Sequence, residues 1–151
     1  MIRNGVERRV SGLRTEVGVS KAHPNRLRFM YAYTILTGGI LGFALLVAPS
    51  TMLPALGIPT EEPFLGGILY SVWLAEAILS AFGLRYPVKF APVLLLQLTY
   101  KLIWLVAIII PHLVTGQLPT FAMTTSALYI TFVIGDMIAI PWRHIFTSDL
   151  Q

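Results

Sequence analysis

The stretch "FAPVLLLQLTYKLIWLVAIIIP", residues 90–111, decides the fold of this chain. Lys101 is the only charged residue in this otherwise apolar run. A helix needs roughly 20 mostly apolar residues to cross the hydrocarbon core of a bilayer, so the run is long enough. The sequence therefore predicts a transmembrane helix that carries a lysine near its middle.

The rest of the chain repeats this pattern. Hydrophobic residues make up 56% of the 151 residues and charged residues 12%, whereas a typical soluble domain has about 25% charged residues. The apolar residues fall into four blocks, which predict spans at about residues 29–49, 64–83, 90–110 and 121–140. Because the loops between the blocks are short, sequential helices should be antiparallel neighbours. We therefore expect an all-α, antiparallel four-helix transmembrane bundle over residues 29–142.

The basic residues predict the orientation of this bundle. The arm of residues 1–28 carries seven of them, the loop between the second and third spans carries Arg85 and Lys89, and the tail of residues 143–151 carries Arg143. The other two loops carry none. The positive-inside rule then places both termini and the middle loop in the cytoplasm. Because the basic residues flank apolar runs, we expect no nucleic-acid partner.

The N-terminal arm has two interpretations. Val6, Val10, Leu13 and Val17 have the spacing of one helical face, which is typical of an interfacial helix bound to anionic lipid. Three glycines weaken such a helix and favour a disordered arm that only sets topology; these are Gly5, Gly12 and Gly18. Both interpretations remain open, and the lipid bilayer is the expected partner in each.

Three charged residues should share one layer near the middle of the membrane. From the outer ends of their helices, at about 1.5 Å per residue, Lys101 lies about 15 Å deep, Glu76 about 18 Å and Asp136 about 22 Å. The hydrocarbon core is about 30 Å thick, and an isolated charge there costs at least about 2.5–3.5 kcal/mol. We expect Glu76 to hold Lys101, with Asp136 as a second partner or competitor.

Polar and aromatic side chains should surround these charges. Gln97 lies one helical turn from Lys101, and Ser80 lies one turn from Glu76. Two tryptophans lie one turn outward and are expected to cover the pair and to stack on the ammonium, with Tyr129 beside them. The predicted site for a ligand or an ion pair therefore consists of Glu76, Lys101, Asp136, Gln97, Trp73, Trp104 and Tyr129.

Two functional hypotheses follow from this cluster. Two carboxylates and one ammonium leave one extra negative charge, so one carboxyl is expected to be protonated in a low-dielectric site. This arrangement is typical of a protein that binds or transports a small ligand or couples to protons. A structural ion pair is the alternative, in which the charges fix helix packing within an accessory subunit of a larger membrane complex. The sequence leaves both open.

Enzymatic chemistry has little support in the sequence. The chain has no cysteine, and it lacks the nucleophile-elbow, phosphate-loop, zinc-protease and dinucleotide motifs. His23, His112 and His144 share no common depth inside the bundle, so a bis-histidine haem or a zinc site is not expected. We therefore expect no metal, no cofactor and no catalytic residue.

Small residues in the first two spans predict close helix packing. Gly38, Gly39 and Gly42 lie in the first span, and Gly67, Ser71 and Ala75 follow each other at four-residue intervals in the second. Such spacing lets helix backbones approach closely. We expect these two sets to pack the first span against the second, with a homo-oligomer as the less favoured use.

The glycine-rich first span, the stretch "LRYPVKFAPVLLLQLTYKLIW" (residues 84–104) and the stretch "IPWRHIF" (residues 140–146) also carry a resemblance. From Arg28 to Trp142 the layout resembles small four-helix bacterial inner-membrane proteins of the DoxX-like group. The resemblance implies a location in the bacterial inner membrane. It brings no assigned catalytic residues.

Overall fold

The computed structural model describes residues 23–59, 63–142 and 145, and all regular structure within these residues is helical. In chain order the elements are α2 (Pro24–Thr34), the π-helical turn η1 (Ile35–Gly39), α3 (Ile40–Val47), α4 (Pro49–Ala55), α5 (Pro63–Arg85), α6 (Ala91–Trp104), the π-helical turn η2 (Leu105–Ile109), α7 (Ile110–Val114) and α8 (Thr120–Ala139). Most of the basic arm and nearly all of the C-terminal tail lie outside the described residues.

Four helices are long and apolar enough to cross a membrane, as the sequence predicts. These are Pro24–Val47, Phe64–Arg85, Ala91–Val114 and Thr120–Ala139. The first begins at Pro24 rather than Phe29, so the last residues assigned to the arm belong to the helix. Proline suits this first position because it has no N–H for the helix to leave unpaired.

The third span continues through Pro111 to Val114, past its predicted end at about residue 110. The helix widens into the π-helical turn η2 immediately before Pro111 and then continues as α7. A wider turn accommodates a proline, which lacks the N–H of the regular helical ladder. The helix ends instead at Val114. Gly116, two residues further on, has a φ of 70°, and the N–H of Gln117 donates to the carbonyl of His112 at 3.1 Å.

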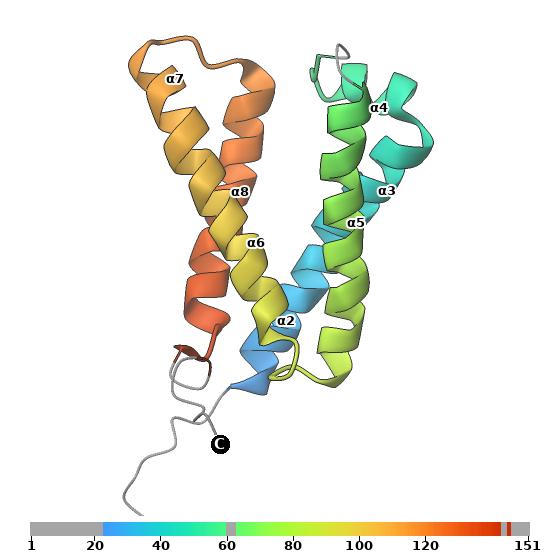
Figure 1. Cartoon of the computed structure of the whole chain (residues 1–151), viewed down its shortest axis with the longest axis vertical. Helices are drawn as coiled ribbons and strands as arrows, with labels where there is room; N and C mark the ends of the chain where they lie inside the picture. Colours follow the sequence, from blue (N-terminus) through green and yellow to red (C-terminus); the bar gives the residue numbers. More distant parts are fainter. Residues whose placement is uncertain (1–22, 60–62, 143–144, 146–151) are drawn as a thin grey trace, which may run out of the picture.

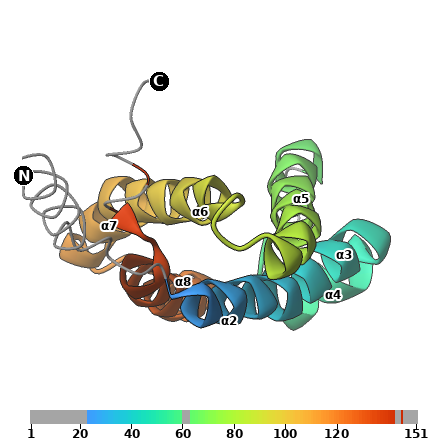
Figure 2. The same cartoon turned by 90° about the horizontal axis from the view of Figure 1, so that it is seen from below.

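The four spans form two pairs that meet at one end and diverge at the other (Figure 1). On one side α3 and η1 pack against α5, and on the other α6 and η2 pack against α8. At the lower end in Figure 1, α2 contacts α5, α6 and α8, and it thereby joins the two pairs. The view from below shows α2 between α8 and α3, with α6 and α5 on the opposite side (Figure 2).

The lower half of the molecule, which we call the closed half, has a tightly packed core. Its members are Leu27, Met30, Tyr31, Ala91, Leu94, Leu98, Phe132, Ala139 and Ile140. The Tyr31 ring packs directly on Gly83, where an added Cβ would meet it at 2.7 Å. The Tyr31 hydroxyl donates to the carbonyl of Pro87 at 2.7 Å, so α2 is fixed against the α5–α6 turn.

The upper half, which we call the open half, has a smaller core of Leu45, Leu53, Tyr70, Trp73 and Tyr129. Here Gly39 and Gly42 allow α3 and η1 to lie against α5, and an added Cβ on Gly42 would meet the Tyr70 carbonyl at 2.9 Å. Gly67, Ser71 and Ala75 were expected to pack the second span against the first, and this prediction is wrong. Gly67 has nothing within 4 Å of an added Cβ, and Ser71 and Ala75 are exposed.

Candidate functional site

A layer of polar side chains separates the closed half from the open half, and each of the four spans contributes to it. Thr34 comes from α2, Glu76 from α5, Gln97 and Lys101 from α6, and Asp136 from α8; all five are buried. Glu76 and Lys101 are each 3% exposed, and Asp136 is 0% exposed. Charges this deeply placed require partners inside the protein.

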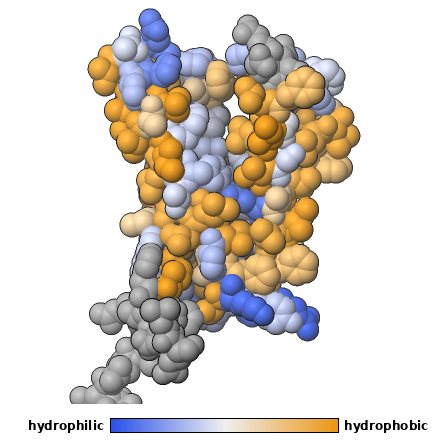
Figure 3. Space-filling view, viewed as in Figure 1, coloured by the Kyte–Doolittle hydropathy of each residue, from blue (hydrophilic) through white to orange (hydrophobic). Residues whose placement is uncertain are grey.

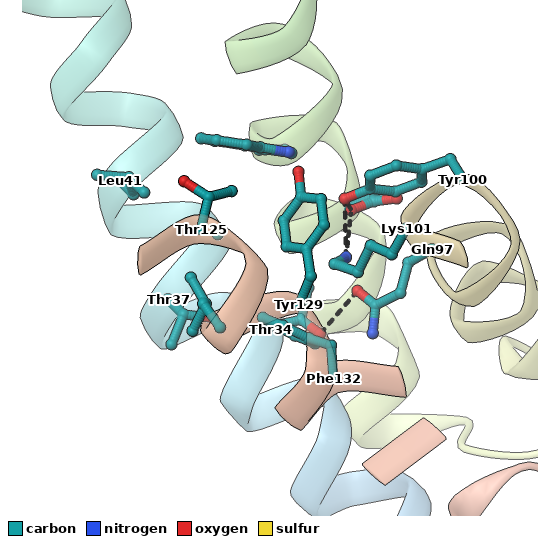
Figure 4. A pocket seen from close by; sticks show the side chains of 13 residues that line it. Thr34, Thr37, Leu41, Gln97, Tyr100, Lys101, Thr125, Tyr129 and Phe132 are labelled. Carbon is teal, nitrogen blue, oxygen red and sulfur yellow. Dashed lines mark hydrogen bonds and ion pairs between the residues drawn. The ribbon is translucent and has the colours of Figure 1, made fainter. Parts of the chain in front are cut away.

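The predicted ion pair between Lys101 and Glu76 is present. Lys101 Nζ lies 3.9 Å from Glu76 Oε2, which is too long for a direct hydrogen bond. Tyr100 bridges the pair, because Lys101 Nζ donates to the Tyr100 hydroxyl at 2.7 Å and this hydroxyl donates to Glu76 Oε2 at 3.1 Å (Figure 4). The Tyr100 hydroxyl therefore forms one hydrogen bond with the ammonium and one with the carboxylate, which are too far apart to bond each other directly.

Asp136 has a different partner from the expected one. Gln97 Nε2 donates to Asp136 Oδ2 at 2.8 Å. The single hydroxyl proton of Thr34 is shared between two acceptors, the Met30 carbonyl at 2.9 Å and Gln97 Oε1 at 3.2 Å. The described residues contain no ion pair between Asp136 and Lys101 within 4.0 Å. Asp136 therefore belongs to a second network, which connects α8 through α6 to α2.

Of the three aromatic residues expected beside the ammonium, only Tyr129 has its ring over it. Lys101 Nζ lies 4.3 Å from the centroid of Phe132, 4.4 Å from that of Tyr100 and 5.3 Å from that of Tyr129. The predicted stacking of the tryptophans on the ammonium is wrong. Trp104 instead packs edge-on against Tyr129, with ring centroids 5.1 Å apart. The tryptophans form a second aromatic layer outside the first.

A small cavity of about 40 Å³ adjoins the ion pair. Its lining is Thr34, Thr37, Gly38, Leu41, Trp73, Glu76, Gln97, Tyr100, Lys101, Thr125, Leu128, Tyr129 and Phe132, most of which Figure 4 labels. One water needs about 10–15 Å³ of such space, so the cavity can hold a few waters or one small polar group. The space-filling view shows the surface hollowed between the two helix pairs, with polar residues inside the hollow (Figure 3).

Several polar atoms in this layer have unused hydrogen-bonding capacity. Among the described residues, Glu76 Oε1, Asp136 Oδ1 and Ser80 Oγ are buried without a hydrogen-bond partner. An ammonium carries three donors, and Lys101 donates one hydrogen bond, to Tyr100. Buried polar groups in folded proteins are nearly always satisfied, so these atoms indicate a place for a proton, a water or a ligand.

The sequence does not predict that Tyr100, Phe132 and Thr34 belong to the site. Tyr100 directly precedes Lys101, and adjacent residues of a helix do not normally face the same neighbour, so no spacing rule selects it. Phe132 lies one turn from Asp136, and Thr34 lies inside the first span; both signals are available but are shared by many core residues. Within the described residues, no three His, Cys, Asp or Glu side chains are placed to hold a metal ion.

Comparison of the chain with protein-family models, with curated proteins and with solved structures gave no match. The DoxX-like resemblance therefore stays a prediction.

Proposed function

We propose that this chain is a multi-pass protein of the bacterial inner membrane, an antiparallel four-helix bundle with both termini in the cytoplasm. The contacts of the closed half support this orientation, because Arg28 Nε donates to the Leu84 carbonyl at 3.2 Å. The start of α2 and the α5–α6 turn therefore share one end of the molecule. This end carries Arg26, Arg28, Arg85 and Lys89, the pattern of a cytoplasmic face.

The orientation is testable with single cysteines, since the chain has none of its own. Gln117 and Lys89 are both exposed and lie in the α7–α8 and α5–α6 connections. A membrane-impermeant maleimide added to intact spheroplasts should label Gln117→Cys, and it should label Lys89→Cys only after lysis. The reverse pattern would overturn the proposed orientation.

The function that the geometry supports best is binding of a small ligand at the Glu76–Tyr100–Lys101 cluster. A cavity lined by a buried ion pair, with Glu76 Oε1 unpartnered, is the observation that carries this proposal. A purely structural ion pair gains most when every donor and acceptor is satisfied. Here Glu76 Oε1 and the unused N–H groups of Lys101 belong to residues that line the empty space.

Native mass spectrometry of protein extracted gently from its own membrane tests this function. We expect a reproducible small-molecule or lipid mass on the wild-type protein and its loss from the Glu76→Gln/Lys101→Met double variant. The double variant leaves no charge of the pair unpaired, so it should remain folded. Thr99→Val, on the exposed side of α6, is the matched control and should keep the mass. A mass that the double variant retains would contradict binding at this cluster.

An accessory subunit is the second candidate, and one surface feature favours it. A groove on the outside of the α3–α5 pair is lined by Leu46, Phe64, Gly67, Ile68, Ser71, Val72 and Ala75. Small exposed residues allow a helix of another subunit to approach closely. A protein subunit that co-purifies in fixed ratio and is lost with Gly67→Leu would favour this candidate, whereas retention in Gly67→Leu would remove its support.

A further inference from the structure

The cavity has a side opening between the first and last spans. Its half-buried lining residues include Thr37 and Leu41 on the first span and Thr125 and Leu128 on the last; we call these four residues the rim. Below the rim the two spans are joined, because the Tyr33 and Thr131 hydroxyls lie 2.7 Å apart in a hydrogen bond. In the described part of the chain, α8 packs against α2 and makes no extensive contact with α3.

The depth of the rim places this opening beside lipid chains. Leu41 lies six residues inside the end of its span at Val47, which is about 9 Å, and Thr125 lies five residues inside Thr120, which is about 8 Å. The hydrocarbon of one leaflet is about 15 Å thick, half of the bilayer core. A molecule dissolved in this leaflet therefore meets the rim without passing through water.

The cavity limits what such a molecule presents to the ion pair. Its volume of about 40 Å³ admits a head group of a few heavy atoms, and the rest of the molecule must extend past the rim. Glu76 Oε1 needs a donor, and the unused N–H groups of Lys101 need an acceptor. A head that both donates and accepts satisfies both, whereas a carboxylate head repels Glu76 and an ammonium head repels Lys101.

We propose that the natural ligand is a single-chain amphiphile with a small neutral head group that donates and accepts hydrogen bonds, as a hydroxyl, a carboxylic acid or a primary amide does. The head enters from the outer leaflet through the rim and bridges Lys101 and Glu76 Oε1. Its chain runs out between Leu41 and Leu128 into the lipid. This inference rests on the proposed binding function and adds the class of ligand and its route of entry.

A photoreactive long-chain alkanol, with a diazirine next to its hydroxyl, tests the proposal on the full chain in lipid nanodiscs. Peptide mass spectrometry should place its cross-links on the peptides that carry the rim and the cavity. Undecanol should compete with the probe. Undecane, which has no head, and propanol, which has no chain, should not compete at the same concentration.

Variants separate the head contact from the entry route. Glu76→Gln/Lys101→Met should lower cross-linking by about tenfold or more, since it removes charge-assisted hydrogen bonds. Leu41→Trp should lower cross-linking because the larger side chain obstructs the rim. If this variant does not fold, Thr125→Trp obstructs the rim from the opposite side and replaces it in the test. Ile134→Trp, on the exposed face of α8 at 55% exposure, is the matched control and should leave it unchanged.

Each alternative outcome has a distinct meaning. Competition by propanol as strong as by undecanol would overturn entry from the lipid and would leave the proposed binding site standing. Equal competition by methyl undecanoate, which only accepts hydrogen bonds, would overturn the two-way head group. Cross-links spread over lipid-facing residues such as Phe64 and Ile134, with no competition, would overturn the amphiphile proposal, while the native mass measurement would still judge the proposed function.

Discussion

The closed and open halves of the molecule are built from the same four apolar spans, yet only one of them is packed by all four. In the closed half, Gly83 admits the Tyr31 ring and Gly135 admits the Met30 side chain, so α2 fills the space between α5 and α8. In the open half the first span stays packed against α5 and diverges from α8 (Figure 1). The charges lie where this packing ends, so the fold itself places them at the base of a hollow.

Loss of one charge should have the largest effect. Lys101→Met leaves Glu76 buried with a single hydrogen bond from Tyr100, and breaking a buried pair typically costs about 3–5 kcal/mol. We expect a loss of this size in the free energy of unfolding, measured by circular dichroism in mixed micelles of mild detergent and dodecyl sulfate.

The double variant is the control for this prediction. Glu76→Gln combined with Lys101→Met should recover much of the stability that either single variant loses, because no unpaired charge remains. A Lys101→Met protein as stable as the wild type would refute the ion pair as a source of stability.

The second network should respond more weakly. Gln97→Leu removes the only hydrogen bond that the Asp136 carboxylate receives from a described residue. Leaving a buried acceptor unpaired costs about 1–3 kcal/mol, or more when it is charged. The same unfolding measurement should therefore show a loss in this range. An unchanged stability would mean that Asp136 is protonated or hydrated and does not depend on Gln97. Thr99→Val on the exposed side of α6 serves again as the control.

A pair of glycine variants compares a packed position in the closed half with a position on the outer face of the open half. In Gly83→Ala the new Cβ lies 2.7 Å from the Tyr31 ring, and Tyr31 cannot move without losing its bond to Pro87. Overpacking of this kind costs about 1–3 kcal/mol. Gly67→Ala meets nothing within 4 Å and should be neutral or slightly stabilising, since alanine favours the helix. Equal effects of the two variants on thermal unfolding would contradict the tight packing of Tyr31 on Gly83 in the closed half.

The sequence predicts the spans well because hydrophobic length and the grouping of charges are local properties. It also predicts the Glu76–Lys101 pair, because the two residues lie at similar depth in helices that follow each other in the chain. It does not predict that Tyr100 bridges them or that Gln97 takes Asp136. Those contacts depend on the rotation of each helix about its axis and on the divergence of the first span from α8. Both are set by packing at Gly42, Gly83 and Gly135, which depth alone does not reveal.

The smallest effect is expected at the rim, where two threonines allow a matched comparison. Thr34 is 2% exposed and holds Gln97 Oε1 as well as the Met30 carbonyl, so Thr34→Val should cost about 1 kcal/mol through the lost hydrogen bonds. Thr125 lies half-buried on the rim, and Thr125→Val should stay within about 0.5 kcal/mol of the wild type. Thermal unfolding of the two variants in the same nanodiscs provides the measurement. A larger loss from Thr125→Val than from Thr34→Val would mean that the rim is packed as firmly as the polar layer. A molecule could then not enter the cavity from the side.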